Sequence, residues 1–172
     1  NYNYCNSGYV ALARIVELIT GTDFPDFMEA TFFEPLGMKN TVIRKYKKKA
    51  PKVLRTYSKK GVPMPRSTCM WIVGDGGVYS NINDLQKWGL FLAGESSLGN
   101  KIPTQMFTKS KVLTSSSYGY GIRLDASSSG RPRYRHGGSW RGAKTAMQYV
   151  PAFGVFSFIL GNNSAESELT ST

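Results

Sequence analysis

The hydrophobic pattern of this chain changes near residue 117, and that change limits the folds the chain can adopt. Before residue 117, apolar residues recur at helical spacing from Gly8 to Thr20, again after Pro25, and again after Ser80. After residue 117 they alternate with polar residues, and short clusters of turn-forming residues separate the runs. Helices followed by hairpin-linked strands indicate an α+β fold with an antiparallel sheet.

The expected helices begin and end at recognisable signals. The first, from Gly8 to Thr20, has a narrow polar strip and is expected to be buried on most sides, with Asn6 or Ser7 as its cap. The second begins near Pro25, turns Phe27, Met28 and Phe32 inward, and ends before Pro35. The other expected elements are helices at 80–93 (capped by Ser80) and 103–109, strands at 118–124, 133–136, 143–150 and 155–160, core positions for Phe153, Phe156 and Phe158, and a loop with short extended pieces at 41–71.

Cysteine, histidine and hydropathy usage exclude several classes of protein. Two cysteines are too few for a disulfide framework; Cys5 is expected to be a buried free thiol, and a bridge to Cys69 stays open. A single histidine and two scattered cysteines argue against a structural zinc site, so we expect neither metal nor cofactor. No apolar run is long enough to span a bilayer.

The net charge of +11 has a local origin. Residues 39–66 contain 11 basic residues and no acid, with Tyr46 and Tyr57 among them. Such a segment is most often a solvated loop, but a basic run with aromatic residues is also typical of nucleic-acid-binding modules. The basic residues are Lys39, Arg44, Lys45, Lys47, Lys48, Lys49, Lys52, Arg55, Lys59, Lys60 and Arg66.

The chain's one histidine lies in His136-Gly137-Gly138-Ser139, at the end of an expected strand. Because glycine has no Cβ, a ligand can approach the main-chain N–H groups there, which suits a carboxylate or an oxyanion. The alternative is a glycine-rich hairpin with a structural histidine. Ser139 does not fit a nucleophile elbow, because Arg141 occupies the place of the last glycine and no histidine follows.

A second candidate pattern is Tyr4-Cys5-Asn6, directly before the first helix. Its phenol and amide can point into one cleft, and a phenol acts as a base near neutral pH only where cations favour the phenolate. The alternative is that Asn6 caps the helix and Tyr4 packs as an aromatic residue.

Taken in order, four segments resemble the serine hydrolases related to β-lactamases and penicillin-binding proteins, in the branch of class C β-lactamases, esterases and D-aminopeptidases. The resemblance extends from Tyr4 to about Asn163 and implies a β-lactamase/transpeptidase-like fold. It implies one incomplete domain, with a mainly helical part at 1–117, the basic loop at 39–66, strands at 118–161 and the start of a C-terminal helix at 162–172. The segments are Tyr4-Cys5-Asn6, Pro35-Leu36-Gly37-Met38, Gly74-Asp75-Gly76-Gly77 and His136-Gly137-Gly138.

The resemblance also implies roles for these residues. Tyr4 would relay a proton, Asn6 would hold a lysine and the substrate amide, and His136 would add positive or dipolar character. Gly138 and Ser139 would contribute to the oxyanion hole, and Gly137, Tyr57 and Trp140 would contact substrate. The family's Ser-x-x-Lys element is absent; Thr56-x-x-Lys59 and Thr108-x-x-Lys111 are the nearest matches. The chain is therefore expected to be the C-terminal part of a larger enzyme and inactive by itself.

Three hypotheses follow from these patterns. The first is part of a serine hydrolase that acts on an ester, amide or β-lactam-like carbonyl through an acyl-enzyme, with a small-molecule or peptide-like substrate and the missing N-terminal part of its own domain as partners. The second is a non-catalytic relative that binds a peptide or polymer, and the third is a basic nucleic-acid-binding module. Enzymes of the resembling family commonly work in the periplasm or outside the cell.

Overall fold

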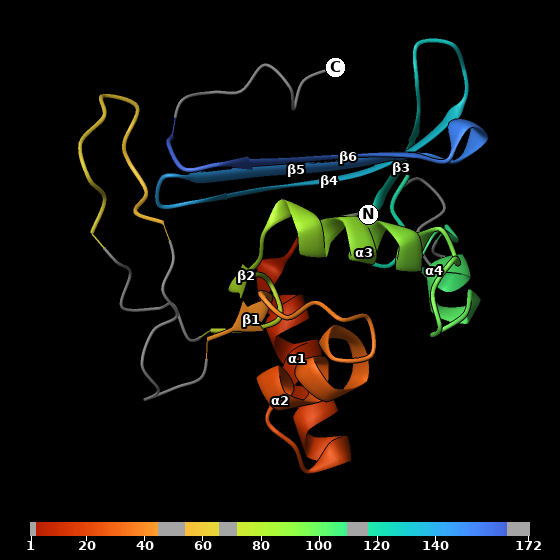
Figure 1. The fold of residues 1–172 in the computed structure, drawn as a ribbon, viewed down its shortest axis with the longest axis horizontal. Coiled ribbons are helices and arrows are strands. Elements are labelled where there is room, and N and C mark those ends of the chain that lie inside the picture. The colour runs from red at the N-terminus through yellow and green to blue at the C-terminus, as the bar shows by residue number, and fades with distance from the viewer. Residues whose placement is uncertain (1–2, 45–53, 66–71, 110–116, 165–172) are drawn as a thin grey trace.

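A layer of helices lies under one face of a four-stranded antiparallel sheet (Figure 1). The computed structural model describes residues 3–44, 54–65, 72–109 and 117–164. Outside the described residues lie 165–172 of the expected C-terminal helix start and 45–53 and 66 of the basic loop, among them Lys47, Lys48 and Lys49. The α+β architecture predicted from the hydrophobic pattern is confirmed.

The sheet is a meander in the order β3-β4-β5-β6. Its strands are β3 (Arg123–Ala126), β4 (Pro132–Trp140), β5 (Ala143–Val150) and β6 (Val155–Gly161). The predicted strands at 143–150 and 155–160 are confirmed. The strand predicted at 133–136 continues to Trp140, because Gly137 and Gly138 pair with Ala146 and Thr145 of β5.

The first strand of the sheet is shorter than predicted. Instead of a strand over 118–124, a tight turn joins Gly119 N–H to Ile122 O at 2.8 Å, with φ of 81° at Gly121. β3 then pairs with β4 only as far as Arg135. Among the described residues, the β4 segment from His136 to Trp140 therefore has a strand partner on one side only, β5.

Helix α3 (Ile82–Leu92) packs against the sheet. Gly89 is buried there, and a Cβ at this position would lie 3.2 Å from the Phe156 ring, so the helix approaches β6 closely. The prediction of Ser80 as the cap is wrong. The cap is the next residue, Asn81, whose side chain accepts the Asp84 N–H at 2.9 Å. The core position predicted for Phe153 is also wrong.

Phe153 is 62% exposed, in a short 3₁₀ turn (η2, Pro151–Phe153) between β5 and β6. The Arg131 guanidinium lies over its ring at 4.9 Å from the centroid. A residue in a hairpin connection has no second layer to pack against, which is why the aromatic pattern alone misplaced it.

Helix α1 (Asn6–Thr20) begins two residues earlier than predicted, with Cys5 as the cap residue and no side-chain capping bond. The expected burial on most sides is wrong, because Ala13 is the only buried residue of the helix. Cys5 is exposed rather than buried, and Cys69 lies outside the described residues. The exposed apolar side chains of the helix are Leu12, Ile15, Leu18 and Ile19, at 48–79%.

Helix α2 (Phe24–Met28) continues into a π-helical turn, η1 (Glu29–Phe33), as the predicted second helix. Phe33, Met38 and Ile43 form a buried cluster below it. Ile43 belongs to a two-stranded sheet of β1 (Val42–Ile43) and β2 (Val78–Tyr79). The predicted helix at 103–109 is α4 (Lys101–Met106), shifted toward the N-terminus.

Gly74 allows the segment Gly74-Asp75-Gly76-Gly77 to approach α1 closely. Its φ is 107°, and a Cβ there would lie 2.4 Å from Tyr9 O and 2.9 Å from Ala13 Cβ. Only glycine fits this backbone conformation and this close approach.

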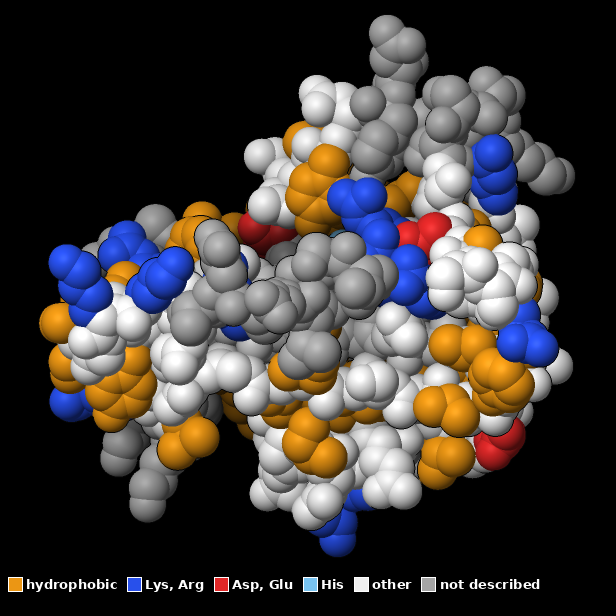
Figure 2. All heavy atoms as spheres, turned by 90° about the horizontal axis from the view of Figure 1, so that it is seen from above, with side chains coloured by type: hydrophobic (Ala, Val, Ile, Leu, Met, Phe, Trp, Pro, Cys, Tyr) orange, Lys and Arg blue, Asp and Glu red, His pale blue; other side chains and the backbone are white. Residues whose placement is uncertain are grey.

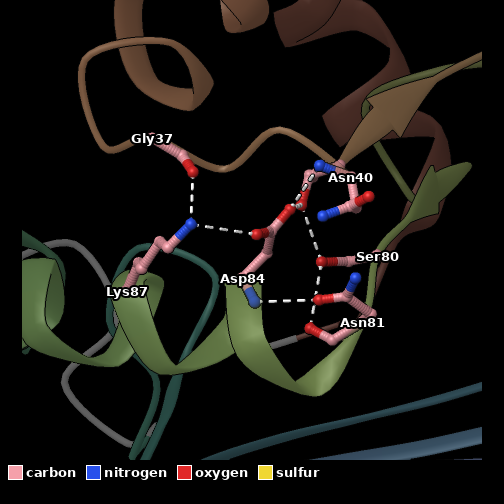
Figure 3. Close-up of polar contacts among 7 residues, drawn as sticks. Gly37, Asn40, Ser80, Asn81, Asp84 and Lys87 are labelled. Carbon is pink, nitrogen blue, oxygen red and sulfur yellow. Dashed lines mark hydrogen bonds and ion pairs between the residues drawn. The ribbon is translucent and has the colours of Figure 1, made fainter.

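A buried carboxylate links α3 to the loop before β1 (Figure 3). Asp84 is 0% exposed, and its Oδ2 accepts the Asn40 N–H at 2.7 Å and the Thr41 hydroxyl at 2.9 Å. The Thr41 hydroxyl also lies 2.7 Å from Ser80 Oγ. On the other side, Lys87 Nζ lies 3.3 Å from Asp84 Oδ1 and donates to the Gly37 carbonyl.

Burial alone would raise the pKa of Asp84. Hydrogen bonds from the Asn40 N–H and the Thr41 hydroxyl, with the Lys87 ammonium, outweigh burial and hold that pKa below its ordinary value. Asp84 is therefore charged in the folded protein near neutral pH.

Residues 54–65 of the basic loop form a small hairpin. Met64 N–H donates to Thr56 O at 2.9 Å, and Ser58 and Gly61 close the turn. Tyr57 joins the hairpin to the end of β6, because its N–H donates to Asn162 O at 2.8 Å. The expectation of short extended pieces in 41–71 is confirmed by β1 and this hairpin.

The face of the sheet turned away from α3 is basic. Arg133 and Arg135 of β4 both face Asp125 of β3, with Arg135 Nε 2.6 Å and Arg133 Nη2 3.8 Å from its Oδ2. Seen from that side, blue Lys and Arg side chains outnumber the red acidic ones (Figure 2). Asp125 is the only acid in residues 117–164, so this face keeps a positive excess.

Candidate active site

Three aromatic rings from distant parts of the sequence meet beside β4. The Tyr4 and His136 ring centroids are 6.4 Å apart, and the Tyr118 ring lies 6.3 Å from each. Tyr4 precedes α1, Tyr118 precedes the turn before β3, and His136 lies on β4. The phenol and the imidazole singled out in the sequence are thus neighbours, and Tyr4 is 47% exposed.

Burial favours a neutral His136 ring. Its Nε2 lies 3.0 Å from the Tyr118 hydroxyl. Burial lowers the pKa of His136 below its ordinary value of 6.5, and the Arg123 guanidinium lowers it further, whereas a hydrogen bond with the Gly137 backbone raises it. His136 was expected to add positive or dipolar character. At neutral pH the ring is therefore uncharged and contributes only its dipole.

Tyr118 is the residue that the sequence analysis missed. Tyr118 and Tyr120 look equivalent in Ser117-Tyr118-Gly119-Tyr120-Gly121, and both were placed in a strand. The turn at Gly119–Ile122 separates them, so that Tyr118 is 6% exposed and Tyr120 is 63% exposed. No local sequence signal distinguishes the two.

The two glycines of β4 differ in their surroundings. A Cβ on Gly138 would lie 2.6 Å from Thr145 Oγ1, whereas a Cβ on Gly137 would meet nothing closer than 3.5 Å. Both glycines and Ser139 are exposed. In an antiparallel ladder alternate residues turn their N–H and C=O groups outward, so the half of β4 without a second partner presents such groups at its edge.

Asn6 and the predicted substrate-contacting residues have different positions. Asn6 is the first residue of α1 and is exposed, two residues after Tyr4. Trp140, at the end of β4, is 59% exposed and lines a groove. Tyr57 is half-buried, and its main chain lies against the turn that follows Trp140. Thr56, its neighbour, lines the groove.

Within the part of the chain that the structure describes, no group of three or more His, Cys, Asp or Glu residues could hold a metal ion. In the same residues, no helix has the length and hydropathy needed to cross a bilayer.

The arrangement is that of an α+β hydrolase-like domain, in which helices cover a meander sheet and a tyrosine lies beside a glycine-containing strand. The family model described as Beta-lactamase matches residues 1–170, and the chain belongs to this family. The resemblance inferred from the four sequence segments is therefore confirmed.

The curated relatives are enzymes and penicillin-binding proteins of low identity. A D-aminopeptidase of Gluconobacter oxydans is 21% identical over 99% of this chain and 33% of its own length. Penicillin-binding protein 4* of Bacillus subtilis is 27% identical over 84% of this chain and 36% of its own length. The chain thus spans about a third of the length of these relatives.

Solved structures share the fold. The octameric penicillin-binding protein homologue from Pyrococcus abyssi has a TM-score of 0.80 and 25% identity, covering 96% of this chain and 40% of that one. A D-stereospecific amidohydrolase from Streptomyces has a TM-score of 0.75 and 22% identity, covering 94% and 50%. A class C β-lactamase from Rhodobacter sphaeroides has a TM-score of 0.76 and 15% identity, covering 98% and 57%. The predicted β-lactamase/transpeptidase-like fold is confirmed, and the chain is related to serine hydrolases.

Proposed function

We propose that this chain supplies the tyrosine, the oxyanion-binding strand and part of the substrate site of a serine hydrolase that works through an acyl-enzyme. The observation that carries the proposal is the 6.4 Å separation of the Tyr4 and His136 rings, beside the half of β4 that, among the described residues, pairs with β5 alone. Family membership supports the same reaction class.

In this proposal the nucleophilic serine comes from polypeptide outside these 172 residues. The chain contains no Ser-x-x-Lys, and the exposed apolar side chains of α1 offer a surface on which further polypeptide can pack. The serine oxygen bonds to the substrate carbonyl carbon, and the bond from that carbon to the leaving group breaks. Tyr4 passes the serine proton to the leaving group, and water then releases the acyl group by the reverse route.

The strand and the other residues have separate tasks. The main-chain N–H of Ser139 binds the oxyanion, and Gly138 precedes it in a position where a Cβ would lie 2.6 Å from Thr145 Oγ1. Asn6, at the start of α1, holds the amide of the substrate. His136 orients the tyrosines as a neutral, hydrogen-bonded ring rather than as a cation.

For the substrate we propose an ester or amide, in preference to a β-lactam. The related proteins named D-aminopeptidase and D-stereospecific amidohydrolase support this preference. Histidine in the strand position where β-lactamases have lysine supports it further, since a neutral ring meets a β-lactam carboxylate less well.

The test uses the natural protein that carries this sequence, with 4-nitrophenyl butyrate and D-alanine 4-nitroanilide as substrates. Removing a general acid–base typically costs about 10²–10⁴ in rate, so Tyr4→Phe is expected to lower kcat by at least about 10²-fold. Tyr120→Phe, which removes the hydroxyl of an exposed tyrosine, is the matched control and is expected to leave kcat unchanged.

A fluorophosphonate probe tests the nucleophile separately. Covalent labelling of a serine outside residues 1–172, located by peptide mass spectrometry, is expected. Labelling of a serine inside this segment, or equal activity of Tyr4→Phe and wild type, would contradict the proposal. Absence of both labelling and turnover would favour the non-catalytic hypothesis.

A further inference from the structure

A groove lies against the same strand that carries His136. It has a volume of about 1440 Å³, and Trp140 and Thr145 are among the residues that line it. Thr145 pairs with Gly138, and side chains two apart on a strand share a face, so His136, Gly138 and Trp140 face the groove side of the sheet. At roughly 3.3 Å per residue, Trp140 lies about 13 Å along β4 from His136.

The groove has an apolar wall. Trp140, Leu160 and Val78 are 59%, 44% and 53% exposed, and all three line it. Large apolar side chains that stay exposed around a concave surface are typical of a ligand-binding groove.

The charged side chains of the lining are all positive. Arg55 and Arg141 line the groove, and no Asp or Glu of the described residues does so. With two guanidinium groups and no carboxylate among the described lining residues, the lining contributes a positive potential at this end of β4.

Contacts join the basic hairpin, which carries Arg55, to the β4–β5 turn, which carries Arg141. Thr56 Oγ1 donates to Arg141 O at 2.7 Å. Gly142 is buried against the hairpin, because a Cβ there would lie 2.6 Å from Tyr57 O. Arg141 has φ of 40°, in a two-residue turn where Asn or Gly is favoured, so turn geometry does not explain an arginine here.

We propose that this groove binds the acyl part of the substrate, and that Arg55 and Arg141 select acyl groups that carry a carboxylate at the end of an apolar chain. The inference rests on the proposed hydrolase and names its substrate class. The apolar chain lies along the Trp140 wall, and the carboxylate accepts hydrogen bonds from the two guanidinium groups.

The test compares two esters with acyl chains of equal length, 4-nitrophenyl hydrogen glutarate and 4-nitrophenyl pentanoate. Wild type is expected to have the higher kcat/KM for the glutarate ester. Because both arginines are exposed, Arg55→Gln and Arg141→Gln are each expected to lower the glutarate-to-pentanoate ratio by about three- to tenfold. Raising the ionic strength is also expected to bring the glutarate-to-pentanoate ratio closer to one, because salt screens the charges of the two arginines.

Arg131→Gln is the control. It removes the same charge from an exposed arginine that lies over Phe153 and is not among the groove-lining residues. We expect it to leave the ratio unchanged. An equal loss in this control would show general charge steering and would overturn the proposed site.

The two proposals fail in different ways. If the natural protein turns over neither ester, the hydrolase proposal is contradicted. If it turns over both esters with no preference, or with a preference that the Gln variants keep, only the proposed carboxylate selection is contradicted. Binding gives a readout without turnover: glutaric acid monoanilide is expected to shift the Trp140 indole N–H resonance at lower concentration than pentananilide. Equal concentrations for the two compounds would contradict the selection directly.

Discussion

Nε2 of His136 lies 3.0 Å from the hydroxyl of Tyr118, a residue that is 6% exposed. The His136 ring is therefore anchored from the protein interior, while Tyr4 lies on its more exposed side. In the proposed hydrolase this geometry would make Tyr118 a positioning residue, because it would act on Tyr4 and on the substrate only through His136 and ring packing.

Tyr118→Phe should release the histidine without emptying the space that Tyr118 fills. We expect the populations of the two neutral His136 tautomers, measured from ¹⁵N spectra at pH 8, to change when the Tyr118 hydroxyl is removed. In the natural enzyme we expect kcat to fall by about threefold to thirtyfold, in line with the loss of one hydrogen bond. Tyr120→Phe is the control, and an unchanged tautomer in Tyr118→Phe would contradict the positioning role.

The lowered pKa of His136 predicts a loss of stability in mild acid. Below about pH 6.5 the unfolded chain binds a proton that the folded chain resists, so the free energy of unfolding falls until pH passes below the folded pKa. Above pH 6.5 this contribution is constant. Urea unfolding at pH 5 and pH 7.5 measures it, and His136→Gln should show a smaller difference between the two pH values than wild type.

Asp84 also predicts that the free energy of unfolding falls in acid, but at lower pH than for His136, because the pKa of Asp84 is also lowered in the folded protein. Its charged form is stabilised in the fold, so this contribution is present above about pH 4 and is lost as pH falls through the folded pKa. Asp84→Asn should lower the free energy of unfolding at pH 7 by about 3 kcal/mol, since it leaves Lys87 without its partner and disturbs a buried hydrogen-bond network. Asp75→Asn, at an exposed carboxylate, should change it by no more than about 0.5 kcal/mol.

Gly74→Ala and Gly130→Ala separate backbone conformation from close packing. Both glycines have positive φ, 107° and 75°, but a Cβ meets Tyr9 O at 2.4 Å at Gly74 and nothing within 4 Å at Gly130. We expect a cost of about 1 kcal/mol at Gly130 and about 3 kcal/mol or more at Gly74, measured by thermal or urea unfolding. Equal costs would show that α1 moves freely away from the Gly74 segment.

The sequence predicted the elements with strong local signals. The 143–150 and 155–160 strands are short runs of mostly apolar residues on either side of Pro151-Ala152-Phe153-Gly154, and Pro25 marks the start of a helix, so local signals were sufficient for them. Predictions went wrong where tertiary contacts decide. Residues 118–122 of the strand expected at 118–124 form a turn, α1 is exposed where its apolar residues indicated burial, and Phe153 lies on the surface.

The residues of the candidate site also divide into those that the sequence identifies and those that only tertiary contacts identify. Tyr4, Asn6, His136, Gly137, Gly138 and Ser139 were identifiable because their spacing matches a family, although their catalytic roles stay predictions. Tyr118 was not identifiable, because its neighbour Tyr120 has the same local surroundings. Its importance comes from the 3.0 Å contact with a residue 18 positions away.

The order of helices and strands, the place of the glycines in β4 and the concentration of positive charge are predictable from residue order, because they depend on residues near one another in the chain. Long-range packing is needed to hold His136 neutral by burial beside Tyr118 and to bring Arg55 and Arg141 to one groove. Burial and electrostatic surroundings depend on which distant segments pack together, and local residue order does not contain that information.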